Sequence, residues 1–333
     1  MKPRWSGFHS PLARDIEAFL AHKRAAGRSY KSEEFQLRML DAFLTERRIR
    51  RVASIDDGTL GAFLASRRRR TSRSFNSLVS VLERLFDWLV AQERLRRSPL
   101  RARHRRRGGP SRRPFILDRA AVQQLLAAAA TLKDDSRNHC APRRGSIYRA
   151  IFGILYALGL RVGELVRLRW QDVDFDRRVL TIHETKFGKS RFVPFGPRVE
   201  ATLHAHREAE VRRGWHQPKW PVFSFGGRGR GIHVTTISST FRRLRSKLGL
   251  VLPPGVAPPR LHDLRHSFAV GTLVRWYREG IDPSRRLLHL ATFMGHVDAN
   301  STAVYLTLTP ELLSEASSRF HEFAAPASLE VPS

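Results

Sequence analysis

Apolar residues recur at intervals of three and four along the first hundred positions of the chain, which predicts amphipathic helices. The clearest pattern lies between 74 and 92, where one face carries Phe75, Leu78, Leu82, Leu85 and Leu89. Similar patterns predict helices over 10–27, over 31–46 and from about 54 onward. Four short helices of this kind bury their apolar faces against one another, so residues 1–98 are predicted to form an all-helical four-helix bundle.

The apolar pattern stops between 99 and 114, where arginines alternate with glycine and proline. This segment is predicted to be a basic linker that is extended when isolated. The pattern returns at Phe115, which predicts a second domain over 115–323. Residues 324–333 are predicted to be a disordered tail.

The second domain is predicted to be mostly helical with one small β-hairpin, an α+β fold. Helices are expected after the capping residue Asp118, from Ser146, and over 197–212 and 235–248. β-Branched residues over 179–185 and the segment 191–194 predict the two strands, and Gly188 marks the turn between them.

Charge changes the picture from a generic globular protein to one with a polyanionic partner. Sixty Lys and Arg residues oppose thirty Asp and Glu residues, which leaves a net charge of +30, and most of the basic residues are arginine. Arginine presents a planar fork that fits two phosphate oxygens at once. Nucleic acid is therefore favoured over a membrane surface, and a merely basic protein from a high-GC genome is the alternative.

Cys140 is the only cysteine, so the sequence predicts neither a disulfide framework nor a cysteine-based zinc site. The first residues lack the apolar core of a signal peptide, and no apolar run is long enough to span a bilayer. A cytoplasmic location, beside the bacterial nucleoid, is expected. No metal and no other cofactor is predicted.

Two basic stretches are candidate contacts to the DNA backbone. One lies between the predicted third and fourth helices, where basic residues at a helix start favour phosphate binding; the other lies in the linker. The alternative for both is a solvated surface without fixed contacts. The candidate DNA-binding residues are Arg67, Arg68, Arg69, Arg70, Arg73, Arg105, Arg106 and Arg107.

Candidate chemistry is concentrated between 261 and 305. His262 and Arg265 are three residues apart, so a helix would present both on one face. His296 lies in Met-Gly-His, and Tyr305 follows nine residues later. A phenol, two imidazoles and a guanidinium on a protein this basic indicate phosphate chemistry.

Together with Gly159-Leu160-Arg161-Val162-Gly163-Glu164-Leu165 and the Thr-Lys-Phe-Gly-Lys-Ser-Arg hairpin, these motifs resemble the tyrosine recombinases of the phage integrase family. The order Arg, Lys, His-x-x-Arg, His, Tyr is complete, and the resemblance covers the whole second domain. It implies a core-binding first domain, a catalytic second domain, and strand cleavage and rejoining through a 3′-phosphotyrosine. The sequence after the tyrosine is similar to that of members carried by mobile elements.

The resemblance also implies roles for six residues. Arg161 and Arg265 clamp one phosphate, Lys186 protonates the leaving 5′-hydroxyl, and Tyr305 is the nucleophile. His262 exchanges a proton near the phosphate and His296 donates to one of its oxygens. Glu164 and His266 are expected to support the site.

Non-catalytic interpretations stay open for single residues, since Arg161 could be a surface arginine paired with Glu164. Lys189 is the alternative to Lys186 as the general acid. Two functional alternatives also stay open, a type IB-like topoisomerase and a catalytically silent DNA-binding protein. The implied partners are double-stranded DNA with specific sites and further copies of this chain. The free protein is expected to be a monomer and to form a tetramer in the synapse. A last helix from Pro310 is amphipathic and is expected to dock on a neighbouring copy; completing the core of its own domain is the alternative.

Overall fold

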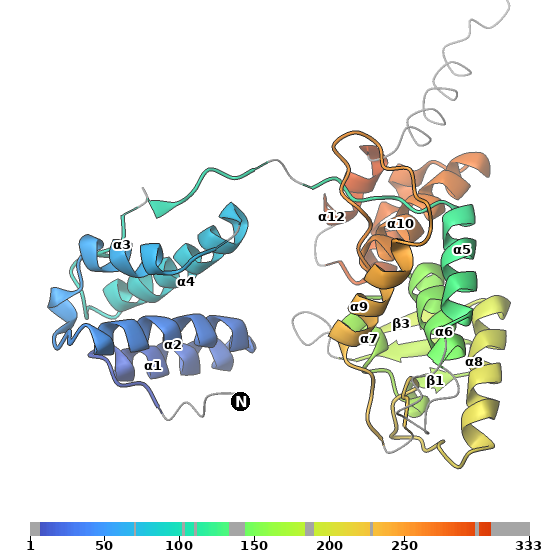
Figure 1. The fold of residues 1–333 in the computed structure, drawn as a ribbon, viewed down its shortest axis with the longest axis horizontal. Coiled ribbons are helices and arrows are strands. Elements are labelled where there is room, and N and C mark those ends of the chain that lie inside the picture. Colours follow the sequence, from blue (N-terminus) through green and yellow to red (C-terminus); the bar gives the residue numbers. More distant parts are fainter. Residues whose placement is uncertain are drawn as a thin grey trace, which may run out of the picture. The chain divides into compact units, whose positions relative to one another are not determined.

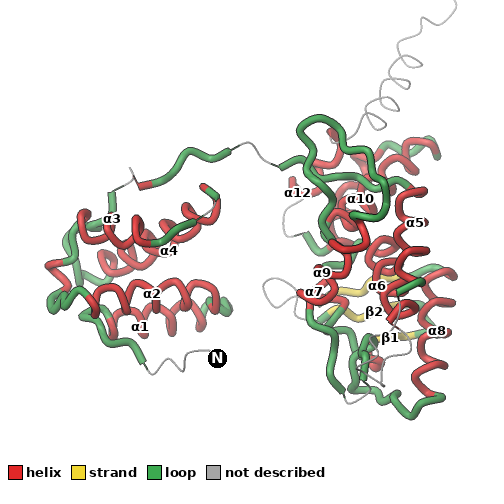
Figure 2. The backbone as a smooth tube through the Cα atoms, viewed as in Figure 1, coloured by secondary structure: helices red, strands yellow, loops and turns green. Residues whose placement is uncertain are grey.

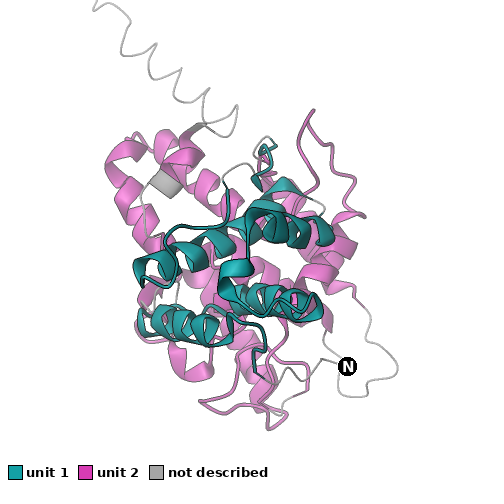
Figure 3. Ribbon diagram, turned by 90° about the vertical axis from the view of Figure 1, so that its left-hand side faces the viewer, with its two compact units in different colours: residues 1–111 teal, residues 112–333 magenta. Residues whose placement is uncertain are grey.

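The computed structural model describes residues 7–69, 71–101, 104–109, 112–132, 144–183, 190–226, 229–296 and 300–307. The chain divides into two compact units, Met1–Ser111 and Arg112–Ser333 (Figure 3). Among the described residues, none of the helices combines the length and the apolar character that crossing a membrane requires. Arg70, Lys186, Lys189, Cys140 and the predicted helix from Pro310 lie outside the described residues.

Helices build the first unit, as its apolar periodicity predicts (Figures 1 and 2). Asp56 and Thr71 cap two of them by accepting backbone N–H groups one turn later, at 2.7 and 3.2 Å. The apolar face of the longest helix is fully buried in the unit's core. The elements are α1 (Ala13–Ala25), α2 (Lys31–Glu46), the 3-10 turn η1 (Val52–Ser54), α3 (Asp57–Ser66) and α4 (Ser72–Ala91).

Residues 99–101 and 104–109 of the predicted linker are attached to the first unit, whereas Arg112 belongs to the second. Leu100 is buried in that unit's core. His104 Nε2 lies 2.6 Å from an oxygen of Asp57, and the Asn76 side chain exchanges two hydrogen bonds with the backbone of Arg106, at 2.7 and 2.8 Å. An arginine-rich segment is therefore ordered along α3 and α4 by a few neutral and acidic side chains.

The second unit contains most of the helices and the only sheet of the described chain (Figure 2). Its first part holds α5 (Arg119–Ala130), α6 (Arg144–Leu158), α7 (Val162–Leu165), the 3-10 turn η3 (Trp170–Asp172), β1 (Val173–Asp174), β2 (Val179–Ile182) and β3 (Arg191–Pro194). Its second part holds α8 (Pro197–Val211), α9 (Val234–Arg245), α10 (Asp263–Arg278), the 3-10 turn η4 (Pro283–Arg286), α11 (Leu287–Met294), α12 (Asn300–Ala303) and the 3-10 turn η5 (Val304–Thr307).

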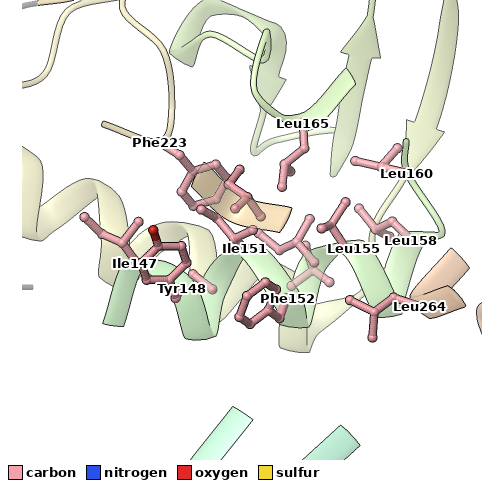
Figure 4. Packing of buried hydrophobic residues seen from close by; sticks show 14 of the residues in the cluster. Ile147, Tyr148, Ile151, Phe152, Leu155, Leu158, Leu160, Leu165, Phe223 and Leu264 are labelled. Carbon is pink, nitrogen blue, oxygen red and sulfur yellow. The ribbon is translucent and has the colours of Figure 1, made fainter. Parts of the chain in front are cut away.

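Helix α6 is the centre of this unit's core (Figure 4). Its residues Ile151, Phe152 and Leu155 are almost entirely buried, and Phe223 and Leu264 come from distant parts of the chain to pack in the same cluster. Tyr148 and Phe152 stack with ring centroids 5.8 Å apart. This mostly buried helix, on which only Ser146, Arg149 and Ala157 are exposed, leads into the loop that carries Arg161.

The sheet has three antiparallel strands in the order β1-β2-β3. The predicted hairpin is present as β2 and β3, with Leu180 opposite Val193. The sequence did not predict β1, because two residues are too short for a period to show. The fold is mostly helical with a small sheet, as predicted.

Candidate active site

The site is assembled at the carboxyl end of α11, where three arginines each donate to one of three successive backbone carbonyls. Arg191 Nε donates to Phe293 O at 2.8 Å, Arg265 Nη2 to Met294 O at 2.7 Å, and Arg161 Nη2 to Gly295 O at 2.8 Å. The last carbonyls of a helix have no partner within the helix and lie at the negative end of its dipole. Guanidinium donors from three other segments therefore satisfy them favourably.

Glu164 joins two of these arginines from the other side. Its carboxylate, in a residue only 4% exposed, accepts from Arg161 Nη1 at 2.8 Å and from both Nη atoms of Arg191 at 3.0 and 2.9 Å. Burial alone would raise the pKa of Glu164, but the hydrogen bonds and charges of Arg191 and Arg161 lower it to about 2. Glu164 is therefore a permanent anion that orients Arg161.

Arg265 is the most enclosed of the cations. Its residue is 2% exposed, and Nη1 donates to Gly159 O at 2.6 Å while Nη2 is bound to Met294 O. Loss of hydration, followed by repulsion from Arg161, lowers the pKa of Arg265 to about 10. The guanidinium stays charged at neutral pH, and two carbonyls fix its plane.

Two glycines make this packing possible. Gly159 (φ +57°) precedes the Arg161 loop, and a Cβ there would lie 2.3 Å from a ring carbon of Phe268. Gly295 (φ +70°) ends α11 in the left-handed region, and a Cβ there would lie 2.8 Å from Arg191 Nη1. Both positions need the conformational freedom and the small volume of glycine.

Three histidines lie around the arginines, and loss of hydration is the first cause that lowers the pKa of each. Loss of hydration, then Arg265 and Arg161, lower the pKa of His296 to about 4. His296 Nδ1 lies 2.7 Å from Thr302 Oγ1, which orients the ring. His262 is solvent-exposed, which limits the effect; its pKa is nevertheless lowered, first by partial loss of hydration and then by His266 and Arg265 beside it.

Tyr305 completes the site from η5. The residue is 4% exposed, and its hydroxyl lies 2.9 Å from His266 Nδ1. Burial raises the pKa of the phenol, and the charges of Arg265 and Arg161 oppose that effect. A tyrosine with an enclosed hydroxyl, near two arginines, is placed to react with an oxyanion that the arginines hold.

The structure brings together five of the six predicted catalytic residues: Arg161, His262, Arg265, His296 and Tyr305. The sixth, Lys186, lies outside the described residues. The predicted supporting residues also lie in the site, Glu164 beside Arg161 and His266 beside Tyr305. The surface pairing of Arg161 with Glu164 is not an alternative to a site role, because the same pair is part of the site.

The predicted DNA-binding arginines lie in the first unit, where their contacts differ. Arg68, Arg73 and Arg107 are exposed. Arg105 is paired with Glu83, and the guanidinium of Arg106 lies 3.8 Å from the centroid of the Phe75 ring. The guanidinium of Arg67 lies 5.2 Å from the Phe63 ring, and Arg69 is half-buried. Arg70 is outside the described residues, and contact of the set with DNA stays a prediction.

Sequence reasoning missed Arg191 and Thr302. The signal for Arg191 was present: side chains alternate along a strand, so Arg191 shares a face of β3 with Val193, which is fully buried. A charged residue on a buried face needs a charged partner. Thr302 had no such signal, because its contact with His296 depends on how the chain turns between them.

The site thus places a buried tyrosine hydroxyl beside an imidazole and two fixed guanidiniums, a cationic arrangement that suits a phosphate. These features define the class of protein. The family model for the phage integrase family matches residues 116–311, a range that contains the three arginines, the three histidines, Glu164 and Tyr305. The chain therefore belongs to the phage integrase family.

Relatives agree with this assignment. The integrase/recombinase homologue y4rB of Sinorhizobium fredii is 41% identical over 207 residues, 62% of this chain and 65% of that protein. Its homologue y4rE from the same organism is 34% identical over 72% of this chain and 74% of that protein. The tyrosine recombinase XerC of Xanthomonas campestris pv. campestris is 26% identical over 92% of this chain and 88% of that protein. The chain thus spans just under two thirds of y4rB and more of the others.

Solved structures share the fold. The Tn1549 transposon integrase in complex with a circular intermediate DNA superposes with a TM-score of 0.61 at 16% identity, over 96% of this chain and all of that one. The XerH recombinase bound to a palindromic difH substrate superposes with a TM-score of 0.60 at 18% identity, over 86% of this chain and 78% of that one. A lambda integrase tetramer bound to a Holliday junction superposes with a TM-score of 0.58 at 17% identity, over 88% of this chain and 76% of that one.

Proposed function

We propose that this protein is a site-specific DNA recombinase that cleaves and rejoins DNA strands through a 3′-phosphotyrosine at Tyr305. One observation carries the proposal: the Tyr305 ring packs in an apolar cluster, but its hydroxyl contacts His266 Nδ1 and is acted on by the charges of Arg265 and Arg161. The net charge of +30 supports a polyanionic substrate. Family membership supports the same activity.

In this proposal Arg161 and Arg265 bind the nonbridging oxygens of one phosphodiester. Each guanidinium has five N–H donors, of which the described contacts with protein use only some. The charge that builds on the phosphate during attack is met by cations already fixed by Gly159, Met294 and Gly295. Such fixed donors lower the barrier because they need no rearrangement during the reaction.

The remaining steps follow from the same residues. Tyr305 attacks the phosphorus, and the 5′-oxygen leaves with a proton from Lys186, the proposed general acid. His262 and His296 contact the phosphate from two sides. Rejoining reverses the steps with another 5′-hydroxyl, so the energy of the broken bond is kept in the phosphotyrosine ester.

The proposed partners are duplex DNA with specific sites and three further copies of this chain in a synapse. The lambda integrase neighbour is a tetramer on a Holliday junction, and the Tn1549 neighbour is a transposon integrase. They support a tetramer and a mobile-element source as proposals for this chain. The protein would act at DNA in the bacterial cytoplasm.

Covalent capture tests this proposal and identifies the target sequence in the same experiment. The protein is incubated with randomly nicked fragments of the DNA flanking its gene, since a nick lets the cleaved end diffuse away and traps the adduct. Detergent-resistant protein–DNA adducts are then isolated and sequenced. The wild-type protein and the matched control Tyr277→Phe should yield adducts at a defined sequence, and Tyr305→Phe should yield none while still binding DNA. Adducts from Tyr305→Phe would refute the assignment.

A further inference from the structure

The group nearest to the Tyr305 hydroxyl is neither of the histidines assigned to the phosphate. It is His266, the last residue of Leu-His-Asp-Leu-Arg-His, whose Nδ1 lies 2.9 Å from the phenolic oxygen. The donor in this contact depends on the ring tautomer: when the ring proton is on Nε2, Nδ1 is unprotonated and accepts from the phenol. The nucleophile therefore rests against a nitrogen that is able to take its proton.

The other two histidines are less well placed for that transfer. The His296 ring lies nearly parallel to the phenol ring, at 20°, with centroids 6.4 Å apart, and its Nδ1 is engaged with Thr302. The His262 ring packs edge-to-face on His266, with centroids 4.8 Å apart. Neither arrangement gives a ring nitrogen the short, direct contact with the hydroxyl that His266 makes.

A buried carboxylate stands behind His266. Asp263 is 2% exposed, and its Oδ1 lies 4.0 Å from His266 Nε2, which is too long for a hydrogen bond but close enough for an ion pair. The other oxygen, Oδ2, accepts the backbone N–H of Arg260 at 2.8 Å and Arg112 Nη2 at 3.1 Å. Asp263 is thus fixed on the side of the imidazole that is remote from the tyrosine.

We propose that Tyr305, His266 and Asp263 form a proton relay in which His266 removes the phenolic proton and Asp263 stabilises the resulting imidazolium. The relay rests on the proposed strand transfer. The bond between Tyr305 Oη and phosphorus forms as the bond between phosphorus and the 5′-oxygen breaks. The phenolic proton moves to His266 Nδ1, and the 5′-oxygen takes its proton from the separate general acid. On rejoining, His266 returns its proton to the departing phenol.

This arrangement has the parts that activate a nucleophile in other enzymes: a hydroxyl, a base in hydrogen-bond contact, and a third group that orients the base. Burial first, and then Arg265 and Arg112, lower the pKa of His266, whereas Asp263 raises it. The ring is therefore neutral before the reaction. The charged and titratable groups that face it are Arg112, His262, Asp263, Arg265, His296 and Tyr305.

His266→Gln is the first test, because glutamine keeps a polar side chain but cannot accept the proton. Formation of the Tyr305–DNA adduct is timed in a single turnover on the captured site. We expect His266→Gln to slow it by about 100-fold or more, the usual contribution of a general base, with DNA affinity unchanged. His289→Gln, the same change at an exposed position of α11, should react at the wild-type rate. A rate for His266→Gln within about threefold of wild type overturns the relay.

A substrate with sulfur in place of the bridging 5′-oxygen separates the base from the acid. A thiolate leaves without being protonated, because the pKa of a thiol is far below that of an alcohol. Sulfur should therefore restore cleavage by Lys186→Ala and leave His266→Gln slow. Rescue of His266→Gln by sulfur would mean that His266 acts on the leaving group, and the relay would be wrong. If wild type and His289→Gln form no adduct on any substrate, the proposed strand transfer itself fails.

The neighbours of His266 supply a second test, which also serves if His266→Gln does not fold. The cleavage rate should fall at acidic pH as His266 becomes protonated. Asp263→Asn removes a charge that favours the imidazolium and should move that fall to lower pH, with a slower plateau. Arg112→Gln removes an opposing charge and should move it to higher pH. If Asp263 and Arg112 form a purely structural ion pair, the two substitutions should not move the acidic fall of the rate in opposite directions. A shift of both profiles in the same direction, or no shift, overturns the relay.

Discussion

Replacing Glu164 with glutamine should cost more stability than its single charge suggests. The carboxylate accepts four hydrogen bonds, from Arg161 N, Arg161 Nη1, Arg191 Nη1 and Arg191 Nη2, at 2.8 to 3.0 Å. In Glu164→Gln an amide N–H₂ would face one of these guanidiniums, which would remain buried without a counter-charge. Removing one partner of a buried ion pair costs about 3–5 kcal/mol.

The pKa of Glu164 gives an independent magnitude. A shift from 4.5 to about 2 corresponds to about 3 kcal/mol, since one pKa unit is about 1.4 kcal/mol. Because the folded-state pKa is lowered, this stabilisation is fully present above pH 4.5 and is lost as the pH falls from 4.5 to about 2. The wild-type advantage over Glu164→Gln should shrink across that range.

Urea unfolding at pH 7 and at lower pH measures both effects. Tryptophan fluorescence is suited to the second unit, because four of the six tryptophans lie there: Trp170, Trp215, Trp220 and Trp276. Glu208→Gln is the matched control, since Glu208 is exposed and pairs with Arg212 at 3.8 Å; it should cost less than about 1 kcal/mol. If Glu164→Gln unfolds within about 1 kcal/mol of wild type at pH 7, the carboxylate does not hold the arginines as described.

Two further substitutions test how backbone groups are held in each unit. Gly295→Ala should lower the free energy of unfolding by about 1–2 kcal/mol through the left-handed backbone alone, and by more because its Cβ would displace Arg191. Formation of the Tyr305–DNA adduct should fall as well. Urea unfolding at wild-type stability would contradict this prediction. Asp41→Ala leaves the backbone N–H groups of His9 and Ser10 without the carboxylate that accepts them. The free energy of unfolding of the first unit should therefore fall by about 1–3 kcal/mol, measured by the fluorescence of Trp88. Unchanged unfolding of that unit would show that the chain start does not depend on Asp41.

The helices and the hairpin could be predicted because their signals are local. Helix α4 repeats its apolar residues at the helical period over five turns, and Asp118 caps α5 as its position indicates. The start of α1 was less predictable. It begins at Ala13, with Leu12 as the N-cap residue, although Ser10 Oγ accepts the N–H of Leu12 at 3.3 Å. The N–H of Ser10 is held by Asp41 from another helix, and a contact 31 residues away has no local signal.

The same distinction explains what the sequence revealed of the site. Arg161, His262, Arg265, His296 and Tyr305 were found because they stand in motifs at characteristic spacings. Glu164 and His266 were predicted from the same motifs, but Arg191 was not, because its role depends on contacts with Glu164 and Phe293, which are 27 and 102 residues away. Motifs point to the groups that are proposed to meet the substrate, whereas Arg191 and Thr302 hold the site through contacts that the fold shows.

The three arginines on the last carbonyls of α11 make that helix end a common anchor. Arg161 and Arg265 come from separate segments, yet the carbonyls that fix them, those of Gly295 and Met294, are neighbours in the chain and directly precede His296. A displacement of this one turn would move both arginines and the histidine together. The site should consequently assemble or come apart as a single cooperative element, and damage at two of these positions should cost less than the sum of the separate losses.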